Sequence, residues 1–358
     1  MPPLGQSSFS LYQQQTRGWL AQHRQFQTTD HLQELQWNGP QEWRPPADIS
    51  SKPQKGILLV HGLGDSPWSF HDLGEQLARQ GFLVRTVLLP GHGSRPEDML
   101  HVTLEDWQRV VDEQVTVLRK EVGQVYLGGF STGGNLVTDY AYRHGDIAGL
   151  VLFSPAFKSD SRIDWLAPWI SWARPWLRDP EAMATTQNPV RYLNVPTNGF
   201  AQFYRSSAQV QDDLAQAYTK PVFMVVAEHD SVLDTQYLLD TFSHRFEHPD
   251  SRLIWYGEAP ATRDPRVIVR TDFLPEQRIS QFSHMGMLFA PGNPLYGMQG
   301  SVRLCRNSTD AQQTELCEQT GQVWYSAWGY QQPGKVHARL TFNPYFEWQG
   351  EIMRAVLQ

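Results

Sequence analysis

A glycine-rich turn directly after an apolar run constrains the fold of this chain more than any other feature. Residues 125–127 (Val-Tyr-Leu) are strand-forming, and Gly-Phe-Ser-Thr-Gly follows at 129–133. This is the G-x-S-x-G pattern of a strand-to-helix turn that presents a serine at its tip. Side chains at Gly129 and Gly133 would collide with the neighbouring strand and helix. The pattern therefore predicts a buried strand, a sharp turn and a helix over residues 132–144.

Apolar runs alternate with helical patterns along most of the chain. Continuous runs, as at 56–60 and 222–226, are typical of strands buried on both faces of a parallel sheet. Further predicted strands span 82–89, 149–153 and 252–256, and predicted helices span 69–80, 104–122, 132–144, 235–246 and 348–357. This alternation predicts an α/β fold with a mainly parallel, doubly wound sheet. Its functional site is expected at the carboxyl ends of the strands.

Two stretches depart from this alternation. Residues 1–50 are polar, and we interpret them as an N-terminal extension in which 31–37 alternate enough for an edge strand or hairpin. Residues 158–218 contain no pattern for a buried strand, which predicts an inserted helical cap. The predicted core therefore comprises residues 51–157 and 219–358, and within it residues 292–332 read as loop-rich.

Three side chains that follow predicted strands have the chemistry of acyl transfer. Ser131 would be the nucleophile, Asp230 the carboxylate that orients an imidazole, and His284 the base that removes the serine proton. The order of the three along the chain is serine, aspartate, histidine. This is the order expected when the nucleophilic serine lies at a strand-to-helix turn of this type. Rival candidates remain for two of the roles. They are Glu228 and Asp234 for the carboxylate, and His248 for the base.

Backbone N–H groups near the serine would complete this machinery. An oxyanion needs preorganised donors, and the candidates are the N–H groups of Thr132 and Leu63. We interpret His61 as a support for the loop of Leu63, and His92 as a loop residue hydrogen-bonded to backbone. The sequence has no cluster with metal-ligand spacing and no phosphate-binding loop, so the predicted mechanism needs no cofactor.

Three glycine-rich motifs accompany the candidate triad: HGLG at 61–64, PGHG at 90–93 and GFSTGG at 129–134. With Asp230 and His284, they resemble the α/β-hydrolase superfamily, and within it the branch of monoacylglycerol lipases, lysophospholipases and bacterial carboxylesterases. The resemblance implies a serine hydrolase of carboxylic esters that acts through an acyl-enzyme, with an acyl pocket under the cap. The insertion before His284 departs from the usual pattern of that branch.

Four tryptophans in the predicted cap recur at steps of four, three and four residues. They are Trp165, Trp169, Trp172 and Trp176. This spacing puts them on one helical face, although Pro168 and Pro175 must start or break the helix. The indoles either pack the cap onto the sheet domain or form an apolar lid that binds an acyl chain and transiently contacts a membrane surface. The second interpretation predicts lipid-like ester substrates, such as monoacylglycerols or lysophospholipids.

The composition limits the kinds of binding partner but does not decide in which cellular compartment the protein works. The net charge is −7 with no basic stripe, which argues against nucleic acid as a partner, and no apolar run is long enough to span a bilayer. Cys305 and Cys317 suit one disulfide, or two free thiols in a reducing compartment. A disulfide would favour export, with the signal segment outside this sequence; the alternative is a cytoplasmic protein. The tripeptide Asn307-Ser308-Thr309 matches the motif of a glycosylation acceptor, and chance explains so short a match equally well.

Two further functions stay open. The same fold could cleave an amide, a peptide N-terminus or a lactone. A peptide substrate would need an acidic anchor for its amine, for which Asp160, Asp164 and Glu181 are candidates. The chain could also be a non-catalytic binding protein on a hydrolase scaffold, although the complete candidate triad argues against this interpretation.

Overall fold

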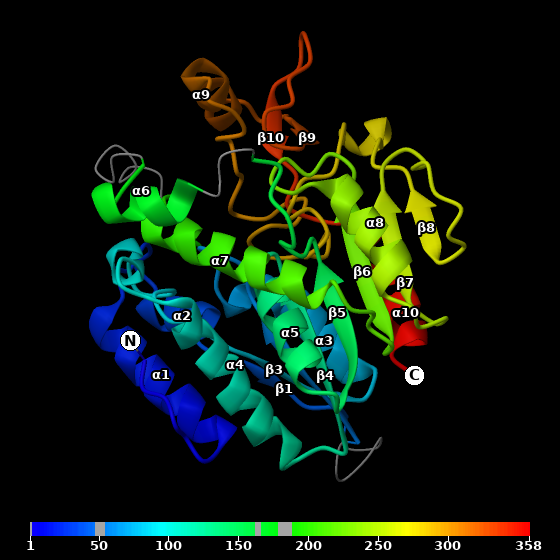
Figure 1. Cartoon of the computed structure of the whole chain (residues 1–358). Helices are drawn as coiled ribbons and strands as arrows, with labels where there is room; N and C mark the ends of the chain where they lie inside the picture. Colours follow the sequence, from blue (N-terminus) through cyan, green and yellow to red (C-terminus); the bar gives the residue numbers. More distant parts are fainter. Residues whose placement is uncertain (1, 47–53, 162–165, 178–187) are drawn as a thin grey trace. The chain divides into compact units, whose positions relative to one another are not determined.

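The chain consists of two compact units, Met1–Gln216 and Ala217–Gln358 (Figure 1). The computed structural model describes residues 2–46, 54–161, 166–177 and 188–358. The boundaries predicted above for the extension, the core and the cap stay predictions.

The first unit holds a mainly parallel sheet with helices around it. Its strands run in the order β1-β3-β2-β4-β5, and only β1 is antiparallel to its neighbour. The strands are β1 (Glu42–Trp43), β2 (Lys55–Val60), β3 (Phe82–Thr86), β4 (Gln124–Phe130) and β5 (Ile147–Phe153). The helices are α1 (Phe9–His23), α2 (His31–Asn38), α3 (His71–Arg79), α4 (Leu104–Arg119), α5 (Thr132–Arg143), α6 (Ala167–Ala173) and α7 (Thr197–Asp213), with short 3₁₀ turns at Pro67–Phe70 and Pro96–Met99.

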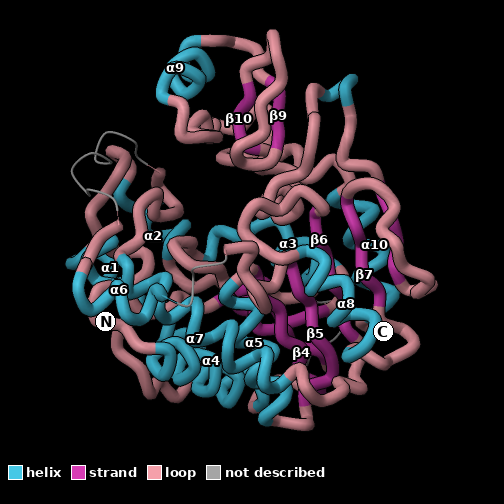
Figure 2. Tube along the Cα trace, turned by 45° about the horizontal axis from the view of Figure 1, so that its top comes forward, coloured by secondary structure: helices cyan, strands magenta, loops and turns pink. Residues whose placement is uncertain are grey.

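The centre of this sheet is apolar on both faces, as the continuous runs predict. The side chains of Ile57, Leu58, Leu59 and Val60 in β2 are completely buried. On one side, α4, α5 and α7 pack against one another (Figure 2). The predicted end of α3 is confirmed, because Gly81 follows the helix with a φ of +97°, a conformation that favours glycine.

The prediction of an edge strand or hairpin at residues 31–37 is wrong, because this segment forms α2. Asp30 caps the helix by accepting the N–H of Gln33 at 3.0 Å. Glu34 is buried and pairs with Arg24 at 2.7 Å. An alternating strand pattern would expose Glu34 on the polar face, whereas the helix turns it inward to this partner. The N-terminal region is thus helical and packed.

The second unit holds a parallel three-stranded sheet in the order β6-β7-β8 and a separate parallel pair, β9 and β10. The strands are β6 (Val222–Ala227), β7 (Arg252–Tyr256), β8 (Val267–Arg270), β9 (Trp324–Ser326) and β10 (His337–Arg339). The helices are α8 (Thr235–Arg245), α9 (Ala311–Gln319) and α10 (Phe346–Val356), with a 3₁₀ turn at Pro275–Gln277. Every side chain of β6 is completely buried, as the apolar run at this strand predicts.

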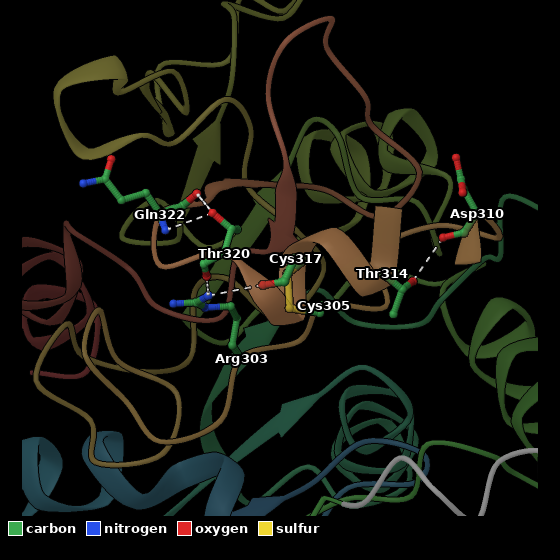
Figure 3. Close-up of a disulfide and its surroundings, with 7 residues drawn as sticks. All are labelled: Arg303, Cys305, Asp310, Thr314, Cys317, Thr320 and Gln322. Carbon is green, nitrogen blue, oxygen red and sulfur yellow. Dashed lines mark hydrogen bonds between the residues drawn. A yellow bond between two sulfur atoms is a disulfide. The ribbon is translucent and has the colours of Figure 1, made fainter. Parts of the chain in front are cut away.

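A disulfide joins Cys305 to Cys317 in the segment predicted as loop-rich, with their Cα atoms 5.4 Å apart (Figure 3). The loop prediction is wrong for residues 311–319, which form α9, capped by Asp310, and for residues 324–326, which form β9. Cys317 is buried in a small apolar cluster. The amide of Asn307 is also buried, and its Nδ2 donates to the Ser326 hydroxyl and the Ala327 carbonyl, both at 3.0 Å. This folded environment disfavours glycosylation of Asn307.

Candidate active site

Ser131 lies at the strained turn between β4 and α5. Its φ and ψ are 54° and −119°, outside the regions that ordinary residues favour, and such a conformation costs about 1–3 kcal/mol. The turn is held from β5, because the Ser131 N–H donates to the Phe153 carbonyl at 3.0 Å and the Ser131 carbonyl accepts the N–H of Ala156 at 3.1 Å. These bonds fix the backbone that presents the hydroxyl.

The glycines on either side of Ser131 are required by close packing. A Cβ atom on Gly129 would lie 2.4 Å from the carbonyl of Gly133, and one on Gly133 would lie 1.9 Å from the carbonyl oxygen of Val60. Real Cβ atoms essentially never approach other atoms so closely. The steric reason given for the G-x-S-x-G pattern is therefore confirmed.

The loop with Leu63 lies against the serine, within the same unit. A Cβ atom on Gly62 would lie 3.2 Å from the Cβ of Ser131, and the Asp65 N–H closes the turn by donating to the Gly62 carbonyl at 3.2 Å. Thr132 is the first residue of α5, so its N–H has no acceptor within the helix. Gly62 and Thr132 thus lie beside the serine, and Leu63 follows Gly62 in the chain, while the role of Leu63 and Thr132 as oxyanion donors stays a prediction.

The side chains of His61 and His92 hold the loop of Leu63 and the segment after β3 by hydrogen bonds. Nε2 of His92 accepts the N–H of Gly64 at 3.0 Å, and Nε2 of His61 accepts the N–H of Leu89 at 3.1 Å. Both imidazoles are completely buried. Burial lowers the pKa of His92 to about 4, and it lowers the pKa of His61 well below its ordinary value, with His92 adding to the effect. The two rings are therefore neutral structural acceptors, as their sequence context indicates.

Asp230 and His284 meet in the second unit. Nδ1 of His284 donates to Oδ2 of Asp230 at 2.6 Å, and the side chains are 17% and 0% exposed, respectively. Oδ1 of Asp230 accepts the N–H groups of Val232 at 2.9 Å and Leu233 at 3.3 Å. Backbone donors thus hold the carboxylate, and the carboxylate fixes the imidazole as the tautomer whose Nε2 is an acceptor.

The rival candidates make other contacts. Glu228 accepts the N–H of Glu258 at 2.7 Å, and Asp234 caps α8. His248 lies 3.9 Å from Asp250, near the solvent. The structure therefore brings Asp230 and His284 together within one unit, and Ser131, Thr132 and the loop that carries Leu63 together within the other. The meeting of the two groups stays a prediction.

The tryptophans of the predicted cap do not share one continuous helix. α6 begins with Pro168 in its first turn and ends at Ala173, before Pro175, so Trp176 lies beyond it. Trp165 falls outside the described residues, and Trp172 lies in α6. Trp169 is 75% exposed, which disagrees with the interpretation of its indole as core packing.

Neither a metal site nor a membrane span is found in the described part of the chain. Among those residues, no three His, Cys, Asp or Glu side chains gather in a way that could hold a metal ion. None of the described helices is both long and apolar enough to cross a bilayer.

Comparison with known proteins places the site in a family context. A family model described as serine aminopeptidase, S33, matches residues 51–259. The chain is 30% identical over 183 residues to the thermostable monoacylglycerol lipase of Bacillus sp. (strain H-257), covering 50% of this chain and 71% of the relative. It is 25% identical over 210 residues to a carboxylesterase of Bacillus subtilis (strain 168), covering 57% of this chain and 83% of the relative.

A solved structure shares the architecture. This structure comes from a study of LipS and LipT, two metagenome-derived lipolytic enzymes. It matches with a TM-score of 0.53 and 21% sequence identity, and the match covers 61% of this chain and 86% of that chain. At this level of identity the likeness concerns the fold. With the parallel strands and flanking helices of each unit, it confirms the predicted α/β-hydrolase fold.

Proposed function

The chain belongs to the serine aminopeptidase S33 family of α/β hydrolases and is an ester hydrolase of the lipase and carboxylesterase type, and we propose that it acts through a triad of Ser131, Asp230 and His284. The hydrogen bond of 2.6 Å from His284 to Asp230 carries this proposal, because it fixes the tautomer in which Nε2 is the proton acceptor. The strained backbone of Ser131 supports its role as the nucleophile.

In the proposed mechanism, Ser131 Oγ attacks the ester carbonyl carbon while Nε2 of His284 takes the hydroxyl proton. The N–H groups of Leu63 and Thr132 stabilise the oxyanion of the tetrahedral intermediate. As the intermediate collapses, the bond to the alcohol oxygen breaks and His284 protonates the departing alcohol. Water, deprotonated by His284, then attacks the acyl carbon; the bond between this carbon and Ser131 Oγ breaks, His284 returns the proton to Oγ, and the acid leaves. Asp230 stabilises the imidazolium in both steps.

Labelling with a fluorophosphonate probe tests the triad. The wild-type protein should be labelled and should hydrolyse p-nitrophenyl esters, whereas Ser131→Ala should lose both activities. Ser69→Ala is the matched control, because Ser69 is another buried serine of the same unit. Labelling of the Ser131→Ala protein at the wild-type rate would contradict the proposal.

We further propose lipid-like esters as substrates, for example monoacylglycerols or lysophospholipids. The name of the Bacillus sp. relative, a monoacylglycerol lipase, supports this class. The exposed apolar side chains of Trp169, Leu177 and Phe200, in and beside α6 and α7, would suit transient contact with a membrane surface. A series of p-nitrophenyl esters should show highest activity at medium or longer acyl chains, and a sharp maximum at acetate would contradict the lipid substrate.

The contact with lipid can be tested separately from the chemistry. Trp169→Ala should weaken binding to phosphatidylcholine vesicles while leaving hydrolysis of a short, soluble ester unchanged. Trp328→Ala is the matched control, because Trp328 is an exposed tryptophan of the second unit. Equal vesicle binding by both variants would argue against contact through the cap.

A second candidate is cleavage of a peptide N-terminus, which only the description of the family model favours. Of the three acidic anchors considered, Asp160 is exposed, and the other two lie outside the described residues. Assays with aminoacyl p-nitroanilides decide between the two reactions. Turnover of these amides above that of the esters would favour the peptidase.

We propose that the protein works in an oxidising compartment, which its disulfide supports. Alkylation of the protein isolated from its natural host, with and without prior reduction, tests this. Cys305 and Cys317 should react only after reduction, and their modification without reductant would contradict export.

A further inference from the structure

A second histidine–carboxylate pair lies next to the candidate pair in the second unit. Nδ1 of His229 lies 2.7 Å from Oδ2 of Asp272, and the Asp272 side chain is almost fully buried. His229 directly precedes Asp230, and Asp272 lies just beyond β8, in the insertion before His284. This insertion is one of the features in which the sequence departs from the usual pattern of the hydrolase branch that it resembles.

Asp272 also contacts the segment that carries His284. The same oxygen, Oδ2, accepts the N–H of Phe282 at 3.2 Å. The Phe282 ring is completely buried and lies 4.6 Å from the ring of Tyr256, at the end of β7. Asp272 therefore connects the loop after β6 with the residue two positions before His284.

We propose that His229 and Asp272 are positioning residues for His284. This inference rests on the proposed triad. Two links join the same two segments: His284 to Asp230 directly, and Phe282 to His229 through Asp272. The hydrogen bond to Asp230 sets the direction of the imidazole, and the second link also fixes the backbone that bears it. A base held in this way keeps Nε2 aimed along one direction.

The charge state of His229 bears on this link. The hydrogen bond with Asp272 raises the pKa of His229 most, burial opposes the rise, and the carboxylates of Asp272, Glu228 and Glu258 add to it. These three carboxylates are the charged groups with the largest effect on the pKa of the imidazole. Because the pKa is raised, the ion pair is fully present at low pH and is lost as pH rises through that pKa. Above it, a neutral imidazole still donates a hydrogen bond to the Asp272 carboxylate, but the attraction between two opposite charges is lost.

Steady-state kinetics on the full chain test the positioning role. Asp272→Ala should lower kcat by about 10- to 100-fold, the usual effect of a misplaced catalytic group, with KM unchanged within about twofold. Its rate of fluorophosphonate labelling should fall in parallel. Asp272→Asn should recover part of the lost kcat, because its side-chain oxygen can still accept the N–H of Phe282 although the ion pair with His229 is gone. The matched control is Asp250→Ala, which removes the carboxylate of the solvent-exposed pair with His248 and should leave kcat unchanged.

The pH profile separates positioning from simple structural support. Wild-type kcat should decline on the alkaline side as His229 loses its proton, and His229→Gln should have a lower, flat alkaline limb. A kcat for Asp272→Ala within twofold of wild type would overturn the inference, as would a lowered Tm with an unchanged kcat. If Asp272→Ala does not fold, a wild-type alkaline limb in His229→Gln would overturn it. These results concern the inference alone as long as Ser131→Ala abolishes labelling; if it does not, the triad itself fails.

Discussion

Acid should loosen the loop that carries Leu63, because two buried histidines hold this region only in their neutral form. His92 accepts the N–H of Gly64 through Nε2, and His61 accepts the N–H of Leu89 in the same way. A protonated Nε2 is a donor and cannot accept either bond. The perturbation is therefore a fall in pH, and the expected response is opening of the loop beside Ser131.

The magnitude follows from the pKa of His92. Its ordinary value is 6.5, and burial lowers the pKa to about 4 in the folded chain. At about 1.4 kcal/mol for each pKa unit, the difference corresponds to about 3 kcal/mol. Because the folded pKa is depressed, this stability is present above pH 6.5 and is lost as pH falls toward 4. The opening equilibrium should thus shift by about two orders of magnitude.

Hydrogen exchange at the Gly64 amide, followed by mass spectrometry and corrected for the intrinsic effect of pH, measures the opening directly. Protection should fall progressively from pH 6.5 to 4 and return when the sample is brought back to pH 7. His92→Gln is the control, because a glutamine oxygen accepts the same N–H at any pH in this range. Constant protection of wild-type Gly64 down to pH 4, or an equal loss in His92→Gln, would refute the reasoning.

Two further predictions concern stability. Burial, with the Asp139 carboxylate adding to it, raises the pKa of Asp213 from 3.8 to about 6, so the favourable protonated form is lost as pH rises through 6. A buried group would give about 3 kcal/mol for this shift. Asp213 is partly exposed, so Asp213→Asn should stabilise by only about 1 kcal/mol at pH 7 and hardly at pH 4. Thermal unfolding of Asp213→Asn, with Asp212→Asn as the control variant, measures this. An equal gain in stability for both variants would contradict the prediction. Replacing Cys305 and Cys317 by serine should speed hydrogen exchange across residues 305–340 by about 100-fold, because closing a loop of 12 residues' separation stabilises by about 3 kcal/mol; wild-type exchange rates would contradict this.

Short-range sterics explain why the serine turn could be predicted from sequence. Gly129 and Gly133 stand two positions from Ser131, and their need for a missing side chain follows from a strand running directly into a helix. The apolar runs of β2 and β6 likewise predict strands buried on both faces, because a parallel sheet covered by helices offers them no polar surface.

Segments with weak local signals were predicted less well. The pattern at residues 31–37 fits a strand or a helix of similar length, and the choice depends on the burial of Glu34 against Arg24. α9 is short and mostly exposed, so it has no apolar stripe to mark it. In both segments, capping by Asp30 or Asp310 and distant contacts decide the structure.

By itself, the sequence determined the strand–turn–helix that presents Ser131 and the residue types available to act with it. Only the tertiary structure decided which carboxylate each histidine would meet. Asp230 and His284 are 54 residues apart, and His229 and Asp272 are 43 residues apart. A hydrogen bond over such a separation depends on the path of every loop between its partners, because a change in direction at one turn moves the side chain beyond bonding distance.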